Sequence, residues 1–318
     1  FSAAALRRSG GDAPVRISFG SCRAAAPHEP PYTSRLDDHP DGRGVDASLM
    51  QTIAREFSLS ETVFIQIPDN PSHTAKIRIF TPGAELPFAG HPTVGTAALL
   101  AELRNPGSTG DREALVVLEE KIGLVRIGVK FRNGQAAFAE FDAPKLPERL
   151  DDPSSKDILS AALGLMPSEI GFQNHRPSAY SAGVPFSFVP VASLDAIAKV
   201  TVQPQYWGQA FSGAAPGSVF VYCRETQHAA SSFHARMFAP HHGIGEDPAT
   251  GSAAAAFAGV VHLFDAPRDG THKRVIEQGF EMGRPSLITL SLVANAGKLT
   301  TVRIGGHAVR VSEGTIEV

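Results

Sequence analysis

The chain has 318 residues, with 29 basic and 32 acidic side chains, a net charge of −3 and 42% hydrophobic residues. This length indicates two domains or one large one, and the apolar fraction is sufficient for a sizeable core. Because the charges are mixed along the chain and no apolar run approaches the roughly 18 residues of a membrane-spanning helix, neither nucleic acid nor a membrane is expected as a partner.

Residues 1–45 lack the periodicity of a helix or a strand. After a short apolar stretch, Val15 to Phe19, the chain becomes rich in proline, arginine and aspartate. Such a composition is typical of loops and disordered segments. We therefore expect loop or disorder in this part of the chain.

Regular structure is expected from Asp46 onwards. Asp46 is a suitable N-cap, and apolar residues recur after it at helical spacing as far as Phe57, which predicts a helix ending near Ser58. A short helix is expected over 157–165, and the final segment, 301–318, is expected to form strands that pair back onto the first half. Apolar and β-branched runs predict strands at 63–67, 75–80, 114–118, 123–131, 136–141, 186–191 and 218–222.

One pattern occurs twice, in residues 78–103 and 236–264. Each copy opens with Arg, an apolar residue and Phe, passes through a glycine-bearing loop, and reaches a polar residue, Pro, two further residues, Gly and a hydroxyl residue. The polar residues are His91 and Asp247, which we expect at or beside the N-cap of a helix because proline suits the first helical position. The residues that follow are almost purely small and apolar, so both helices should be buried on all sides.

The distance between the two copies is too long for a solenoid repeat and indicates duplication of a whole domain. In each half a strand, a glycine bend and another strand follow the central helix, and the bend near residue 122 suits a crossover. We predict an N-terminal half of residues 1–122 and 304–318 and a C-terminal half of residues 123–303. Since helix N-termini attract anions, a site is expected between the two helix starts.

Four segments resemble the phenazine-biosynthesis F-like (PhzF-like) isomerase family: SLSETVF (58–64), FAGHPTVGTA (88–97), GEDPATGSAAAA (245–256) and EQGFEMGRPS (277–286). They stand in the family's order, and the resemblance covers residues 46–318. It implies a diaminopimelate-epimerase-like fold of the α/β (α+β) class, with two related domains that each wrap a mostly antiparallel, barrel-like sheet around a central helix. It also implies a homodimer and an enzyme that uses no cofactor and no metal.

The N-terminal segment departs from this family pattern. Members begin with a strand, a Gly-Asn-Pro turn and an apolar strand, and residues 16–45 show none of these. We therefore expect the first domain to lack its first hairpin.

Glu61 is the candidate general base. A Ser-Glu-Thr at the start of a strand is by itself more often a solvated glutamate, but the resemblance gives this position the role of the proton-transferring glutamate. Such a carboxylate works best when burial raises its pKa toward neutrality. His91 and Asp247 stand where the related amino-acid epimerases carry two catalytic cysteines, so they can bind substrate and relay protons; the alternative for each is a plain N-cap.

Further binding groups are expected at the two helix starts. Backbone or hydroxyl donors of Gly90, Gly251 and Ser252 could hold a substrate carboxylate there. The pair His241 and His242 lacks further ligands at metal-binding spacing and is interpreted as part of a loop.

The two cysteines, Cys22 and Cys223, lie outside these motifs. A catalytic thiol pair is therefore disfavoured, and the two residues indicate a reducing compartment and a cytoplasmic protein.

These observations predict a cofactor-independent isomerase. In it Glu61 removes a proton from a carbon of a small carboxylate-bearing substrate and returns it at another carbon. Two alternatives remain open: an amino-acid epimerase or racemase of the same fold, and a catalytically inactive binding protein, which the unusual N-terminal segment would suit.

Overall fold

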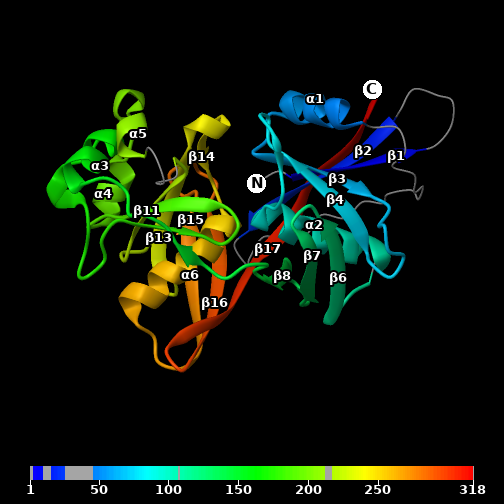
Figure 1. Cartoon of the computed structure of the whole chain (residues 1–318). Coiled ribbons are helices and arrows are strands. Elements are labelled where there is room, and N and C mark those ends of the chain that lie inside the picture. The colour runs from blue at the N-terminus through cyan, green and yellow to red at the C-terminus, as the bar shows by residue number, and fades with distance from the viewer. Residues whose placement is uncertain (1–2, 10–15, 26–45, 107, 212–216, 318) are drawn as a thin grey trace. The chain divides into compact units, whose positions relative to one another are not determined.

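The computed structural model describes residues 3–9, 16–25, 46–106, 108–211 and 217–317. The chain forms two compact units, the first comprising residues 1–142 and 305–318 and the second residues 143–304 (Figure 1). The first unit thus extends beyond the predicted boundary at residue 122. The reason is that the two strands after this bend continue an antiparallel set that begins before it, so the chain leaves the first unit only when that set is complete.

A ring of strands encloses one helix in the first unit. Strand β1 pairs with β2 and, in parallel, with β3; β3 is antiparallel to β4, β4 is parallel to β6, and β6, β7 and β8 are antiparallel neighbours. Strand β17 pairs with both β8 and β2 and closes the ring around α2 (Figure 1). The elements are β1 (Ala3–Ser9), β2 (Arg16–Ala25), α1 (Ala47–Phe57), β3 (Glu61–Gln66), β4 (Ala75–Phe80), β5 (Glu85–Leu86), α2 (Gly90–Arg104), β6 (Arg112–Glu120), β7 (Gly123–Phe131), β8 (Ala137–Asp142) and β17 (Lys298–Glu317).

The hairpin of β1 and β2 corrects two predictions. Residues 3–9 and 16–25 are strands rather than loop or disorder, and the first hairpin, which we expected to be missing, is present. Its neighbours are β3 and β17, which are distant in the sequence, and main-chain pairing with them requires no apolar periodicity. Residues 26–45, which we also predicted to be loop or disorder, lie outside the described residues.

The second unit also alternates parallel and antiparallel pairings. Strands β10 and β11 form a hairpin, β11 is parallel to β12, β12 is antiparallel to β13, β13 is parallel to β15, and β15 is antiparallel to β16. Helix α6 packs against β9, β10, β11 and β16. The elements are β9 (Glu148–Arg149), α3 (Lys156–Leu163), η1 (Pro167–Glu169), β10 (Ser178–Ser181), β11 (Pro185–Pro190), α4 (Leu194–Lys199), α5 (Pro204–Ala210), β12 (Val219–Cys223), β13 (Phe233–Ala239), η2 (Pro240–His242), β14 (Ile244–Asp247), α6 (Gly251–Asp265), β15 (Gly270–Gln278) and β16 (Ser286–Asn295).

The two central helices are buried on almost every side, which confirms the prediction from their composition. Ten of the 15 residues of α2 and 11 of the 15 residues of α6 are buried. Small residues are required where a strand comes closest: a Cβ atom at Gly259 of α6 would lie 2.5 Å from the ring of Tyr180 in β10. No helix in the described ranges is long and apolar enough to cross a membrane.

The other helices cover outer faces of the strands. In the first unit α1 packs its apolar face on Phe64 and Phe80 of β3 and β4, and Figure 1 shows it on the outside of these strands. In the second unit α3, α4 and α5 share a core with β11, β12 and β13. Sequence reasoning missed α4 and α5, which have only six and seven residues and too few turns for a clear apolar period.

The predicted cap of α1 is confirmed and gives a stability test. The Asp46 carboxylate accepts a hydrogen bond from the Leu49 N–H at 2.8 Å, and the helix ends with Ser58 in the left-handed conformation. We expect Asp46→Ala to lower the free energy of unfolding by about 1 kcal/mol because an N–H loses its acceptor. Asp46→Asn keeps an acceptor and should lose little, so equal losses for the two variants in urea denaturation would contradict this assignment.

Candidate active site

Glu61 is a buried acid at the start of a strand. It is the first residue of β3, as predicted, and only 6% of its surface is exposed. Burial raises the pKa of Glu61 to about 8. A carboxyl group with such a pKa exists in both protonation states near neutral pH, and it can therefore accept a proton and give it back.

His91 lies against this carboxyl group. Its Nε2 is 2.9 Å from Oε2 of Glu61, and 11% of its side chain is exposed. His91 is the second residue of α2, whose N-cap is Ala89, so the prediction that it lies at or beside the N-cap was wrong. The helix begins earlier because the Ala89 carbonyl already accepts hydrogen bonds from the N–H and the hydroxyl of Thr93. Gly90 is the first helical residue and is buried.

Asp247 occupies a different place from His91. It ends β14, where it pairs with Met237 of β13, and the N-cap of α6 is Thr250. The prediction that Asp247 lies beside the N-cap was therefore wrong, because the strand pairing holds it outside the helix. Asp247 is 2% exposed, and its Oδ2 accepts a hydrogen bond from the Thr250 hydroxyl at 2.6 Å. Gly251 and Ser252 are the first two residues of α6, the former buried and the latter half-buried.

Gln278 ties the entry of α6 to the sheet. This fully buried residue ends β15, and its Nε2 donates to the Asp247 carbonyl at 2.6 Å and to the Thr250 hydroxyl at 2.9 Å. Its Oε1 accepts from the Thr250 N–H at 3.0 Å. Sequence reasoning singled out neither Thr250 nor Gln278. The signal that could have found Gln278 is its place at the end of the strand that precedes a glycine bend.

An ion network centred on the buried side chains of His234 and Glu277 stabilises this strand end. Nδ1 of His234 lies 2.8 Å from Glu277 and Nε2 lies 2.9 Å from Glu281. Burial lowers the pKa of His234, but the hydrogen bonds to Glu281 and Glu277 outweigh this effect, so the pKa is raised. Two N–H groups, those of Gln227 and His228, also donate to Glu277. The network fixes the turn that follows Gln278.

The other candidate side chains remain apart from these groups. His241 and His242 lie in η2 with ring centroids 4.0 Å apart. Across the described residues, no three His, Cys, Asp or Glu side chains converge as a metal ion would need. Burial raises the pKa of the Cys223 thiol to about 12, which disfavours a reactive thiolate. The side chain of Cys22 lies outside the described residues.

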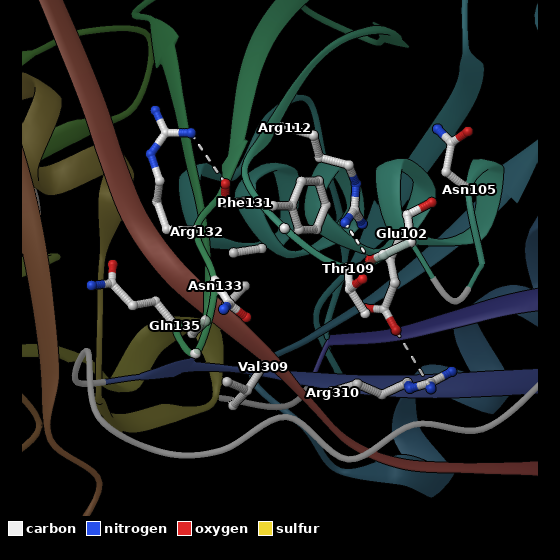
Figure 2. Close-up of a pocket in the computed structure, with 16 residues that line it drawn as sticks. Glu102, Asn105, Thr109, Arg112, Phe131, Arg132, Asn133, Gln135, Val309 and Arg310 are labelled. Atoms are coloured by element: carbon white, nitrogen blue, oxygen red, sulfur yellow. Dashed lines mark hydrogen bonds and ion pairs between the residues drawn. The ribbon is translucent and has the colours of Figure 1, made fainter.

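A pocket of about 250 Å³ lies near the C-terminal end of α2, away from His91. Figure 2 shows the Arg112 guanidinium over the ring of Phe131, 3.6 Å from its centroid, and Arg310 directed toward Glu102 at 3.5 Å. The predicted site residues do not line this pocket. We therefore place the candidate active site at the start of α2, not in this pocket.

Comparison with known proteins supplies the family. Residues 37–314 match the phenazine biosynthesis-like proteins (PhzC-PhzF). The chain belongs to this family. An uncharacterized isomerase of Mesorhizobium japonicum is 53% identical to it over 292 residues, which are 89% of this chain and 95% of that protein. The trans-2,3-dihydro-3-hydroxyanthranilate isomerase of Pseudomonas chlororaphis is 34% identical over 277 residues, 87% of this chain and 91% of the relative.

A solved structure shows the same fold. The crystal structure of a PhzF-family phenazine biosynthesis protein from Bacillus anthracis matches with a TM-score of 0.77 and 24% identity, over 91% of this chain and 97% of that one. The resemblance identified from the four sequence motifs and the predicted α/β fold class are thereby confirmed. The chain is a PhzF-like isomerase.

The turn that packs on the Asp247 loop gives a second stability test. Gly279 has φ +81°, and a Cβ atom there would lie 2.4 Å from the Arg284 carbonyl oxygen and 2.7 Å from that of Pro248. Gly297 has φ +70° but open space around it. We expect Gly297→Ala to lower the free energy of unfolding by about 1–2 kcal/mol through the left-handed backbone alone. Gly279→Ala should lower it considerably more, because backbone atoms must move. Similar losses for the two variants in chemical denaturation would show that the close approach is unimportant.

Proposed function

We propose that this protein is a cofactor-independent isomerase in which Glu61 transfers a proton within a small carboxylate-bearing substrate. The observation that carries the proposal is the buried Glu61 carboxyl, with a pKa of about 8, beside Nε2 of His91. A general acid/base that must act in both directions works best with a pKa near the working pH. The relatives named as isomerases support the reaction class.

The proposed reaction balances without another reactant. The ionised Glu61 takes a proton from a carbon next to an electron-withdrawing group, and the electrons of that C–H bond move into the substrate's π system. The neutral Glu61 then donates the proton to a different carbon and becomes a carboxylate again. His91 hydrogen-bonds the reacting groups and keeps the carboxyl oriented.

Substrate binding is assigned to groups at the helix starts. Helix N-termini present N–H groups without intrahelical partners, which favours a carboxylate. In this proposal Gly90, Gly251 and Ser252 supply such donors, and Asp247 binds a polar group of the substrate. That both helix starts serve one substrate stays a prediction, as do the homodimer and the cytoplasmic location.

The relative from Pseudomonas chlororaphis indicates the first substrate to test. Its name specifies trans-2,3-dihydro-3-hydroxyanthranilate, a ring compound with a carboxylate, an amine and a hydroxyl group. The alternative function considered from the sequence, an amino-acid epimerase that uses two thiols, is disfavoured. His91 and Asp247 stand at the positions where such epimerases carry their cysteines, and Cys223 is buried.

The proposed role of Glu61 can be tested by solvent exchange. With trans-2,3-dihydro-3-hydroxyanthranilate in deuterated water, we expect the wild-type protein to incorporate deuterium into the substrate. Glu61→Gln should lower incorporation by at least about 100-fold, since general acid/base catalysis contributes roughly 10²–10⁴-fold. Incorporation can be followed by mass spectrometry, with Glu56→Gln, an exposed glutamate of α1, as the matched control. Equal incorporation by wild type and Glu61→Gln would remove Glu61 from the reaction.

The raised pKa of Glu61 also predicts the pH dependence. Proton abstraction requires the carboxylate form, whose fraction grows as the pH rises toward about 8. The value of kcat/KM should therefore increase roughly tenfold per pH unit on the acid side of that pKa. A rate that is already level from pH 5 upwards would mean that Glu61 ionises like an ordinary exposed glutamate.

A further inference from the structure

Glu120 is a second buried acid in the first unit, and the proposed reaction does not use it. It ends β6 and is 8% exposed. Its Oε1 lies 2.7 Å from the hydroxyl oxygen of Thr93 in α2, and this hydroxyl oxygen is also 2.8 Å from the carbonyl oxygen of Ala89. Oε2 of Glu120 is buried without a hydrogen-bond partner among the described residues.

The number of protons available for these two hydrogen bonds identifies the protonation state of Glu120. A threonine hydroxyl has one proton to donate and can accept as well. With one proton, the hydroxyl can donate to the Ala89 carbonyl or to Glu120 but not to both. With that proton on the Ala89 carbonyl, which can only accept, the Thr93 oxygen is free to accept a proton from Glu120. Glu120 must be a neutral carboxylic acid for both contacts to be hydrogen bonds. A buried group with one unpartnered oxygen is also far less costly neutral than charged, and burial raises the pKa of Glu120 to about 8.

The charged groups around Glu120 are engaged elsewhere or exposed. Strand β6 packs against α2, β4 and β7, and the residue opposite Glu120 on β7 is Gly123, which has no side chain. Arg104 and Arg126 are exposed, and Arg112 donates to the Ser108 carbonyl. The remaining charged groups of these elements and of the adjoining residues pair as His91–Glu61, Glu102–Arg310, Lys76–Asp69, Arg78–Glu85, Lys121–Glu85, Lys130–Glu140, Glu113–Arg132, Asp111–Arg132 and Glu119–His73.

The second unit has an amide at the corresponding place. Strand β4 pairs in parallel with β6 through Lys76 and Glu119, and β13 pairs in parallel with β15 through His234 and Glu277. The next residue is Glu120 in the first unit and Gln278 in the second. Gln278 cannot ionise, and it holds the entry segment of α6 by hydrogen bonds. The side chain at each strand end thus hydrogen-bonds the start of the central helix, in one unit through a carboxylic acid and in the other through an amide.

We propose that Glu120 is a positioning residue: as a neutral acid it holds the first turn of α2 through Thr93 and thereby keeps His91 against Glu61. This inference rests on the proposed function, because its consequence is measured on the proton transfer. His91 and Thr93 are two residues apart in the same helical turn, so a shift of Thr93 moves His91 as well.

The test compares two substitutions of Glu120. Glu120→Gln can still donate to the Thr93 oxygen, as Gln278 does to Thr250, and should keep kcat of deuterium incorporation within about twofold. Glu120→Ala removes the donor and should lower kcat about tenfold, with little change in KM, because the Thr93 oxygen loses a buried hydrogen bond. Thr93→Ser and Thr93→Val form a parallel pair, in which only the valine variant should show the loss.

Two further measurements report the protonation state directly. An infrared difference spectrum between wild type and Glu120→Gln at pH 7 should contain the carbonyl band of a protonated carboxylic acid. In addition, the wild-type rate should decline at pH values above about 8 as Glu120 ionises, whereas Glu120→Gln should hold its rate there. A substitution that acted only through general stability would leave the pH dependence of the rate unchanged.

The outcomes separate this inference from the proposed function. If Glu61→Gln exchanges deuterium like wild type, the proposed function fails. If Glu61→Gln is inactive while folded Glu120→Ala has the wild-type kcat, the positioning role alone is wrong. Loss of activity in Glu120→Gln, or an infrared spectrum that shows a carboxylate at pH 7, would contradict the assignment of Glu120 as a neutral acid. The glutamine and serine variants decide these points even if Glu120→Ala does not fold.

Discussion

The burial of a helix without a polar face is the constraint on which both units depend. Such a helix loses stability wherever it meets water, so strands must surround it, and a surrounding sheet must close or nearly close. In the first unit the strand pairings form a ring around α2, and the last strand of the chain completes that ring. The start of the helix then lies among strand ends, and the polar side chains on those ends become buried with it.

This burial has an electrostatic consequence. The folded state holds protons on Glu61 and Glu120 that an unfolded chain would release, since their pKa values rise from 4.5 to about 8. Between these two values the folded state binds more protons than the unfolded state, so stability falls as the pH rises, by up to about 1.4 kcal/mol per pH unit for each group. In the proposed function, the raised pKa of Glu61 lets its carboxyl group exchange protons near neutral pH. Glu120 exchanges no proton in the proposed reaction. Its neutral form has a role only if that form makes a specific contact, and the hydrogen bond to Thr93 is such a contact.

The comparison of the two strand ends explains how similar architectures hold different helix entries. Gln278 reaches back to Asp247 and Thr250, so the entry of α6 stays in a strand and loop until Gly251. Glu120 reaches only Thr93, one turn into α2, and the helix there begins earlier, at Gly90. The strand-end side chain therefore helps to decide where each central helix starts. This explains why motifs that match in sequence have non-equivalent structures.

The sequence by itself determined the elements whose signals are local. The cap at Asp46, the strands predicted after it, the two buried helices and the family motifs all follow from residue types at short spacing. Only the tertiary structure decided the hairpin of β1 and β2, the positions of His91 and Asp247 relative to their helices, and the roles of Thr93, Glu120 and Gln278. Most of these depend on hydrogen bonds between segments that are distant in the chain, and such bonds do not produce a periodic pattern in the sequence. A buried carboxyl and a solvated one look alike in a sequence, because the difference between them is made by the atoms that fold around them.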